Sequence, residues 1–399
     1  MAVVGIDVSA LAASAKRAGY SVFSVDYFGD SDLKQSCIFS LSVITQRPGV
    51  SCGRLATNFH PHNLLELVEK LVKTHTIDGI LLSSGLEDDA QTLAKIHDLA
   101  PIIGNHPTKI NQVRTKPWFF RELDRIGVKH PTTRFIEKTE DALEQANEIG
   151  FPIVIKPETG FGGYGVKKIV NAKQLYEILN SKLDEERFLI QDYVDGIDAS
   201  ASVISTASNA FTLTVNEQLL GLNDLGQQEP FGYCGNVVPL DLEQNIELNC
   251  RKLAEKVIRH FGLIGSNGVD FVITHKGDPL GVEVIRRFQG PLEFVVRVLT
   301  INLVKTHIDA CSMNQLPHVK KGSGFCSRLI LYALKRTQVP SLSQFELIRD
   351  IPVQDSFVEQ GEPLCSVVMD GATREIVLHR AQATASAIYR TIANSNKSI

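Results

Sequence analysis

The chain has 399 residues, of which 43% are hydrophobic and 22% are charged. This length predicts two to four domains, and the composition is that of a globular protein rather than of a disordered chain. The 41 basic and 45 acidic side chains give a net charge of -4 without a long run of one sign, which argues against a nucleic-acid partner.

Membrane and secretory segments are not indicated either. No apolar run approaches the roughly 20 residues that cross a bilayer, and the first residues lack the basic and apolar regions of a signal peptide. The seven cysteines are an odd number and include no Cys-x-x-Cys pair, which favours reduced, structural thiols. We therefore expect a cytoplasmic protein without a membrane partner.

The first hundred residues alternate short apolar runs with segments of helical periodicity, from AVVGI and LAASAKRAG to IDGILLSS and EDDAQTLAKIHDLA. Such β-α-β order predicts a parallel sheet covered by helices. The first turn, GIDVSALAAS, has one glycine where a dinucleotide-binding protein has Gly-x-Gly-x-x-Gly. We interpret this part as a scaffold or as a half of a substrate site.

From about residue 107 the pattern changes to mixed α+β. Helices are predicted at TKPWFFRELDRIGV and TEDALEQANEIG, and strands at PTTRFI, PIVIKP, VKKIV, RFLIQDYV and ASASVIS. After a helix at IELNCRKLAEKVIRHFG come two strands around a turn, GVDFVITHKGDPLGVEV. The tail from residue 313 predicts the strands CSRLILYAL and PLCSVVM and a final helix, TREIVLHRAQATASAIYRTI.

Residues 160–165 read GFGGYG and stand between two predicted strands. A Walker loop needs Gly-Lys-Ser/Thr and a helix directly after it, and both are missing here. The loop is therefore predicted to be a hairpin tip whose glycine N–H groups can close over an anion, with Lys156 at its base. A flexible hairpin without a ligand is the alternative.

The segment GVDFVITHKGDPLGVEV predicts an acidic hairpin. With the turn centred between Lys276 and Gly277, antiparallel pairing places Thr274 opposite Pro279 and Asp270 opposite Glu283. Carboxylates opposed at about 5 Å repel each other, so a cation is expected between them, and their oxygen atoms favour Mg²⁺. The alternative is a wet sheet surface without an ion.

Together these segments resemble the ATP-grasp superfamily over most of the chain, up to about residue 312. The resemblance implies that Lys116, in TKPWFFRELDRIGV, and Lys156 contact the phosphates of ATP. The mobile loop would close over them with Gly160, Gly162, Gly163 and Gly165.

The same resemblance implies the rest of the site. The segment FLIQDYVDGID resembles the hinge that holds adenine and ribose, here through Gln191, Tyr193, Val194 and Asp198. Asp270 and Glu283 match the two magnesium carboxylates, with Mn²⁺ as a further metal. Arg287, in RRFQG, matches the arginine that steadies the transferred phosphate, which makes it and Lys156 the catalytic candidates.

The fold class implied is a multidomain α/β and α+β protein with the ATP-grasp fold. The expected domains are an N-terminal parallel-sheet domain (1–106), a small subdomain with the glycine loop (107–186), a large subdomain with the metal hairpin (187–312) and a small C-terminal α+β domain (313–399).

Within this superfamily the chain is most similar to predicted ATP-dependent carboligases related to biotin carboxylase. The similarity rests on DVSALAASAKRAGYSVFSVDYFGDSDL, FGYCGNVVPL, RRFQGPLE and QGEPLCSVVMDG. It implies a ligase that joins a small carboxylate to an amine, or to a thiol, through an acylphosphate. A role in the biosynthesis of one-carbon carriers such as methanofuran and tetrahydromethanopterin, and assembly as a homodimer, are further implications.

Two positions depart from the family pattern. Ile285 stands where an asparagine serves as a third metal ligand, and Arg286 stands where proline is usual. Period-2 alternation places Ile285 on the face of Glu283 and turns Arg286 away from it. Because water can replace one protein ligand of Mg²⁺, we expect ATP to bind and turnover to be reduced.

Two other functions remain open. One is a regulatory protein that binds nucleotide without turnover. The other is a biotin-type carboxylase, which would need a bicarbonate site and a separate biotinyl carrier.

Several other polar residues have weaker patterns. The segment FGYCGNVVP is a candidate acceptor pocket, because a polar cluster flanked by glycine lets a ligand approach closely, and it contributes Tyr233, Cys234, Gly235 and Asn236. Cys234 as a nucleophile is the weaker reading. His60 and His62 lack further metal ligands and are predicted on the surface, while Glu158 is either an ATP contact or a solvated acid.

Overall fold

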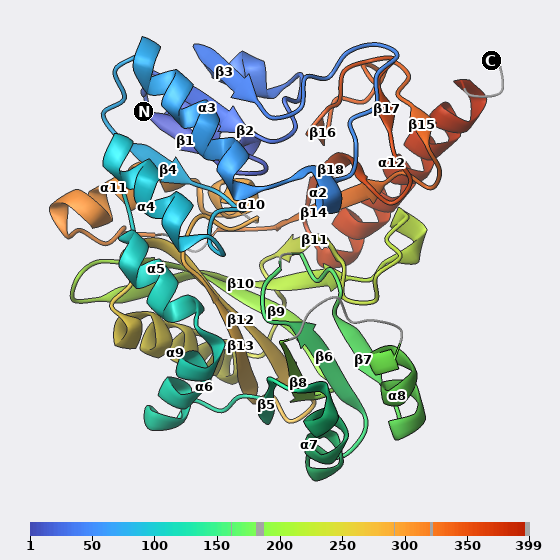
Figure 1. Cartoon of the computed structure of the whole chain (residues 1–399). Helices are drawn as coiled ribbons and strands as arrows, with labels where there is room; N and C mark the ends of the chain where they lie inside the picture. Colours follow the sequence, from blue (N-terminus) through green and yellow to red (C-terminus); the bar gives the residue numbers. More distant parts are fainter. Residues whose placement is uncertain (161, 181–186, 291, 320–321, 396–399) are drawn as a thin grey trace.

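The computed structural model describes residues 1–160, 162–180, 187–290, 292–319 and 322–395 (Figure 1). Its N-terminal unit is a parallel sheet with the order β3-β2-β1-β4. The strands are β1 (Ala2–Val4), β2 (Phe23–Asp26), β3 (Phe39–Ser42) and β4 (Ile80–Leu82). All residues of β1 and β4 are buried, as continuous apolar runs in a sheet covered on both faces require. The predicted β-α-β order is confirmed.

Helices surround this sheet and connect it to the rest of the chain. They are α1 (Ser9–Arg17), η1 (Leu33–Ser36), α2 (Leu55–Asn58), α3 (Pro61–Thr74) and α4 (Ala90–Leu99), followed by α5 (Pro107–Arg114) and α6 (Lys116–Arg125). The loops after β1 and β4 meet at one edge of the sheet, where the Ser83 hydroxyl donates to the carbonyl of Asp7 over 2.6 Å. Ligands of open parallel sheets bind at this carboxyl edge.

A small antiparallel sheet with the order β5-β8-β6-β7 follows. It contains β5 (Thr133–Ile136), β6 (Ile153–Pro157), β7 (Lys167–Ile169) and β8 (Phe188–Asp192), with η2 (Thr139–Asp141), α7 (Ala142–Ile149) and α8 (Ala172–Asn180) beside it. The strands β6 and β7 pair on either side of the glycine loop, so the predicted hairpin is confirmed.

The third layer is an eight-stranded sheet with the order β13-β12-β9-β10-β11-β14-β18-β16. Its strands are β9 (Gly196–Ser205), β10 (Ala210–Leu220), β11 (Tyr233–Val238), β12 (Gly265–Thr274), β13 (Pro279–Ile285), β14 (Phe325–Tyr332), β16 (Ile348–Arg349) and β18 (Pro363–Gly371). Because β11 pairs with β14, the sheet continues from the hairpin region into the C-terminal part. The boundaries of the four domains remain a prediction.

The remaining elements cover this large sheet. They are η3 (Asn223–Leu225), α9 (Gln244–Phe261), α10 (Leu292–Leu299), α11 (Leu303–Met313), the pair β15 (Thr337–Gln338) and β17 (Phe357–Val358), and α12 (Arg374–Ser395). Helix α9 packs on the apolar face of β9, β10 and β12. In the described parts of the chain, every helix is too short or too polar to cross a membrane.

The opposite face of the large sheet is polar from strand to strand. Asp270 faces Ser200, and Ser200 faces Asn216. Further along, Asn236 of β11 faces Arg328 of β14. Within the described residues, buried oxygen atoms of this face that have no hydrogen-bond partner include those of Ser200 (Oγ), Thr214 (Oγ1), Asn216 (Oδ1) and Asp270 (Oδ1). Buried polar atoms are normally satisfied, so this face has hydrogen-bonding capacity that is open to water or to a polar ligand.

Candidate functional site

The acidic hairpin places Asp270 opposite Glu283, as predicted, but it does so through a β-bulge. Ile273, and not Thr274, pairs with Pro279, which corrects the predicted register near the turn. Between Asp270 and Phe271 the register shifts by one residue. Without this bulge Asp270 would face Val282. Bulges redirect single side chains in this way and are frequent near active sites.

Glu283 is held by two cations. Lys116 Nζ lies 2.7 Å from Glu283 Oε1, and Arg114 Nη1 lies 3.6 Å from the same atom. Burial alone would raise the pKa of Glu283, but Lys116 and Arg114 outweigh it and bring that pKa to about 2. Glu283 is therefore ionised at any physiological pH.

Asp270 has the opposite environment. Burial, reinforced by the charge of Glu283, raises the pKa of Asp270 to about 7. Its Oδ1 atom is buried without a hydrogen-bond partner in the described residues. A buried carboxylate oxygen that no donor satisfies, beside a second carboxylate, fits a hard cation such as Mg²⁺.

Lys156 connects the small sheet with the two acids, because its charge interacts with those of Asp270 and Glu283. It lies on β6, and burial, followed by the charge of Lys116, lowers its pKa to about 8, while Glu283, Asp198 and Asp270 act in the opposite direction. Asp198, on β9, has a pKa that burial raises and that Lys156 pulls back. These predicted residues thus interact through their charges, across the two sheets.

The glycine loop lies against β11 and the N-terminal unit. The Gly160 N–H donates to Asp88 over 3.0 Å, and the Tyr233 N–H donates to the carbonyl of Gly162 over 3.0 Å. A Cβ atom on Gly163, whose φ is +79°, would collide with the carbonyl of Phe231, so only glycine allows this contact. Gly165 packs near Pro157, and residue 161 lies outside the described residues.

The three predicted adenine contacts lie at the end of β8. Gln191 is buried and its Nε2 donates to Thr133 Oγ1 over 2.8 Å. The ring of Tyr193 lies under Lys168 Nζ, 3.4 Å from the ring centroid. Val194 follows in the half-buried loop before β9. Their role in binding adenine remains a prediction.

Arg287 and Arg286 differ in their surroundings. Arg287 forms an ion pair with Glu87 of the N-terminal unit and donates to the carbonyl of Phe288. Arg286 is 5% exposed, burial lowers its pKa, and the charge of Glu283 opposes that shift. Arg286 follows the last residue of β13 and was predicted to point away from Glu283, but the charges of the two side chains interact.

The carboxamide of Gln289 lies beside Ile285, the residue that stands at the position of the usual asparagine. Ile285 pairs with Gly268 of β12. A Cβ atom on Gly268 would collide with the carboxamide of Gln289, so this carboxamide lies directly on Gly268. Gln289 therefore places a neutral amide beside Ile285, on the face that carries Asp270.

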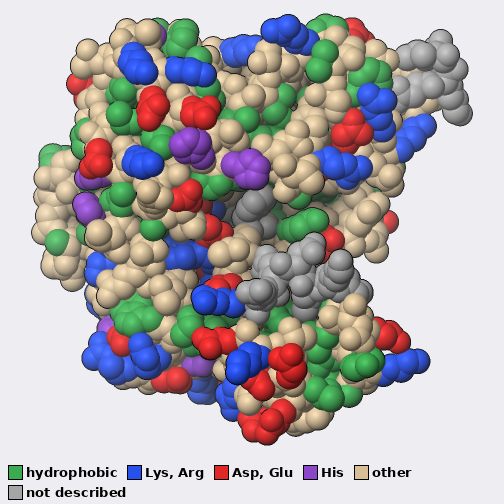
Figure 2. Space-filling model, in the orientation of Figure 1, with side chains coloured by type: hydrophobic (Ala, Val, Ile, Leu, Met, Phe, Trp, Pro, Cys, Tyr) green, Lys and Arg blue, Asp and Glu red, His purple; other side chains and the backbone are tan. Residues whose placement is uncertain are grey.

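Sequence reasoning missed three residues of this site, Glu87, Asp88 and Arg114. Asp88 pairs with Arg114, and Glu87 accepts the backbone N–H groups of Gly85 and Leu86 besides pairing with Arg287. Glu87 and Asp88 could have been predicted from their position in the sequence. They follow the carboxyl end of a parallel strand, where ligand sites form. Figure 2 shows acidic and basic side chains together in the hollow between the N-terminal unit and the small sheet.

The candidates with weaker sequence patterns lie in different surroundings. Tyr233 Oη contacts Asn236 Oδ1 on the polar face. Cys234 is buried, and burial raises the pKa of its thiol, which makes it a poor nucleophile. His60 and His62 lie exposed at the start of α3. Glu158 lies 3.9 Å from Arg187.

Comparison with known proteins gives one family match. Residues 113–291 match the model of the ATP-grasp domain. An uncharacterized protein of Methanocaldococcus jannaschii is 28% identical over 379 residues, which are 94% of this chain and 89% of that protein.

Two solved structures have a similar fold. The biotin carboxylase of Campylobacter jejuni, in a complex with β,γ-ATP, superposes with a TM-score of 0.72 at 18% identity over 95% of this chain and 89% of that one. The L-amino acid ligase of Bacillus licheniformis gives a TM-score of 0.71 at 13% identity, over 97% and 96%. At these identities the likeness concerns the fold, and it confirms the predicted fold class.

Proposed function

Residues 113–291 form an ATP-grasp domain, and from this premise we propose that the chain is an ATP-dependent ligase that joins a small carboxylate to an amine. The observation that carries the proposal is the pair Asp270 and Glu283, brought face to face by a bulge and surrounded by the cations Lys116, Lys156 and Arg287. Phosphoryl transfer asks for positioned positive charge rather than for a covalent nucleophile of the protein.

The proposed reaction has two steps. A carboxylate oxygen of the substrate attacks the γ-phosphorus of ATP, the bond to the β,γ-bridging oxygen breaks, and an acylphosphate and ADP form. The amine nitrogen then attacks the acyl carbon, phosphate leaves, and the nitrogen loses a proton as the amide forms. Lys116 and Lys156 hold the phosphates, and Arg287 steadies the transferred group.

Asp270 and Glu283 would hold Mg²⁺, with Mn²⁺ as a substitute, and the bound metal would neutralise phosphate charge. Before the nucleotide binds, Lys116 Nζ satisfies Glu283. We expect Lys116 to turn from this carboxylate to the phosphates when the metal arrives. The role in one-carbon carrier biosynthesis and the homodimer belong to the same proposal.

The test follows ADP release in Mg-ATP with a panel of small carboxylates and hydroxylamine, which traps an acylphosphate as a hydroxamate. We expect acid-dependent ADP and a hydroxamate that identifies the acid. Asp270→Asn is expected to abolish both, while Asp278→Asn, the same change at a half-buried acid of the hairpin turn that pairs with Lys129, leaves them intact.

A second function is favoured by one observation, the oxygen-free side chain of Ile285 beside the metal carboxylates. The chain would then bind nucleotide and regulate a partner without turnover. Mg-ATP binding with no ADP for any acid in the panel would support this function and contradict the ligase.

A further inference from the structure

A cavity of about 380 Å³ lies between the N-terminal unit and the C-terminal part of the large sheet. One wall is formed by α1 and the segment after it, and the opposite wall by residues 345–351. Phe294 of α10 and Val368 of β18 contribute apolar surface. The volume is in the range of about 300–1,000 Å³ that is usual for small-molecule sites.

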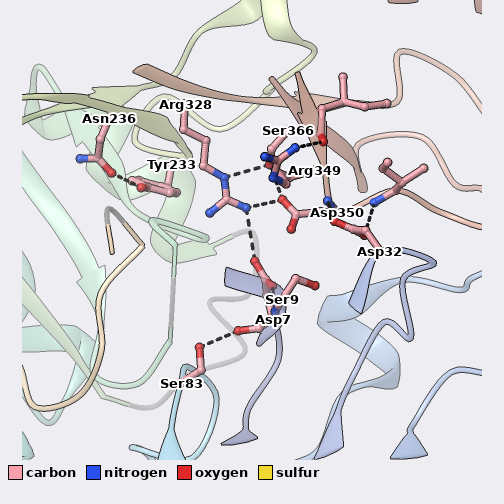
Figure 3. A network of polar contacts seen from close by, with 12 residues as sticks. Asp7, Ser9, Asp32, Ser83, Tyr233, Asn236, Arg328, Arg349, Asp350 and Ser366 are labelled. Atoms are coloured by element: carbon pink, nitrogen blue, oxygen red, sulfur yellow. Dashed lines mark hydrogen bonds and ion pairs between the residues drawn. The ribbon is translucent and has the colours of Figure 1, made fainter. Parts of the chain in front are cut away.

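Ion pairs and hydrogen bonds hold residues 345–351, which form one wall of this cavity, in place. Arg328 donates to Ser366 Oγ over 2.9 Å and pairs with Asp350 and, over 3.3 Å, with Asp7 (Figure 3). Asp32 accepts the backbone N–H groups of Asp350 and Ile351 over 3.1 and 3.0 Å. Arg328 therefore pairs with an acid of each part, Asp7 and Asp350, and these contacts fix the wall that residues 345–351 form to the N-terminal unit.

In the described part of the chain, two charged side chains that line the cavity are not paired. The side chain of Arg17, the last residue of α1, is exposed and has no hydrogen bond or ion pair with any residue that the structure describes, and the same holds for the side chain of Glu346. The two side chains line one cavity, yet they do not pair with each other. The same cavity is also lined by the apolar side chains of Phe294, Phe345 and Val368.

The lining as a whole balances charge. Three arginines and three acids line the cavity, so its formal charge is zero, from Arg17, Arg328, Arg349, Asp32, Glu346 and Asp350. A simple anion would meet the acids and a simple cation would meet the arginines. A ligand that carries both charges, separated by a short apolar chain, satisfies both walls.

We propose that this cavity binds a small zwitterion whose carboxylate faces Arg17 and whose ammonium group faces Glu346, such as an ω-amino acid. The site goes beyond the proposed function and does not depend on it, since the ligand can be a substrate or a regulator. Arg328 pairs with Asp7, and the carbonyl of Asp7 accepts the hydroxyl of Ser83. The loop that contains Ser83 also contains Glu87, which pairs with Arg287. A bound ligand therefore adjoins the loops of the nucleotide site.

The test measures binding to the full chain without nucleotide by saturation-transfer NMR. γ-Aminobutyrate is the probe, and butyrate and n-butylamine, which have the same carbon chain and one charge each, are its controls. We expect the probe to bind about tenfold more tightly than either control. Equal binding of all three would overturn the proposal.

Charge reversal makes the test sharper. Arg17→Glu and Glu346→Lys should each abolish binding of γ-aminobutyrate, and the double variant should restore it with the ligand turned end for end. Lys34→Glu, an equal change at an exposed lysine that does not line the cavity, is the matched control and should bind as the wild type does. Single variants without effect, or a double variant that stays as weak as they are, would contradict the site.

A second arm identifies the role. With Mg-ATP and the carboxylate panel present, consumption of γ-aminobutyrate would support the site as that of a substrate. An altered KM for ATP without consumption would support it as that of a regulator. Because binding is measured without nucleotide, failure of the ligase reaction leaves the cavity to be judged on its own.

Discussion

At the scale of single residues, the two opposed acids are made different by their neighbours. Lys116 and Arg114 satisfy Glu283, and the pKa of Glu283 falls to about 2, while burial raises the pKa of Asp270 to about 7. Two neighbouring carboxylic acids whose surroundings shift their pKa values in opposite directions are typical of functional sites. Asp270 is thus the acid whose protonation reports the arrival of a cation.

Proton release on nucleotide binding is the first prediction. A metal ion beside Asp270 lowers its pKa, so at about pH 7 the binding of Mg-ADP should release about half a proton. Phosphates near Lys156, whose pKa is about 8, raise that pKa, so at about pH 8.5 binding should take up a proton instead. Calorimetry in buffers of different ionisation enthalpy measures both signs.

Two variants control this measurement. Asp270→Asn should remove the release near neutral pH, and Lys156→Arg, which stays charged, should remove the uptake at high pH. The same proton count in the wild type and in Asp270→Asn would show that Asp270 does not meet the metal.

Gly268 supplies a second residue-scale prediction. Its missing side chain leaves room for the Gln289 carboxamide beside Ile285. In Gly268→Ala the colliding atoms are the flexible end of Gln289, so stability should change by less than about 1 kcal/mol while the carboxamide leaves the site and turnover falls about tenfold. Gly281→Ala, on the partner strand, meets only contacts of 3.5 Å or more and is the control. Equal turnover in both variants would contradict a role for Gln289.

Ile285→Asn tests the same slot from the other side. If the Gln289 carboxamide supplies the neutral oxygen that the usual asparagine would give, the added asparagine should change turnover by less than about twofold. Steady-state ADP release measures it. A large gain would show instead that the missing ligand limits the wild type.

At the scale of elements, hairpins were predicted well and the bulge was not. The strand, loop and strand around the glycines and the two acidic strands follow from patterns a few residues long. The shift at Asp270 and Phe271 depends on how β13 packs on β12, and period-2 alternation carries no sign of it. The predicted facing pair was therefore right, while the predicted partner of Pro279 was wrong.

The glycine loop gives the prediction at this scale. Asp88 of the N-terminal unit accepts the Gly160 N–H and pairs with Arg114. Asp88→Asn keeps an acceptor oxygen but removes its charge, which contributes about 1 kcal/mol to such a hydrogen bond, so amide exchange at residues 160 and 162–166 of the free protein should speed up about fivefold. Mass-spectrometric hydrogen exchange measures it.

The control for this loop is Asp224→Asn, which removes an exposed acid far from the loop in sequence. Bound Mg-ADP should abolish the difference, because phosphates then hold the loop. Unchanged exchange in Asp88→Asn would mean that β11 alone holds the loop, through the contact between Tyr233 and Gly162.

At the scale of the whole molecule, the sequence predicted the layers better than their contacts. The parallel sheet and the hairpins are local patterns, and they were correctly predicted. The ion pair of Glu87 with Arg287 and that of Asp7 with Arg328 join residues 200 and 321 positions apart. No local pattern marks such partners, and so the N-terminal side of the site was missed.

Buried acids near this interface shape the stability of the whole chain. Burial, aided by Asp350, raises the pKa of Asp7 to about 6, and burial raises the pKa of Asp26 to about 7. Asp270 behaves in the same way. Opposing them, burial lowers the pKa of His307 to about 4. Asp7, Asp26 and Asp270 therefore hold protons in the folded chain at pH values where the unfolded chain has lost them, whereas His307 loses its proton on folding.

The last prediction follows from this balance. Between about pH 4 and pH 7 the folded chain binds more protons than the unfolded chain, so the free energy of unfolding must fall as the pH rises through this window. Urea unfolding of the nucleotide-free protein at about pH 5 and pH 7.5 should show the higher midpoint at pH 5. In Asp26→Asn the difference should shrink, because Asp26, which accepts hydrogen bonds from Gly29 and Ser42, titrates only in the wild type. A midpoint that rises with pH would mean that neighbouring cations lower the pKa values of these carboxylates more than burial raises them.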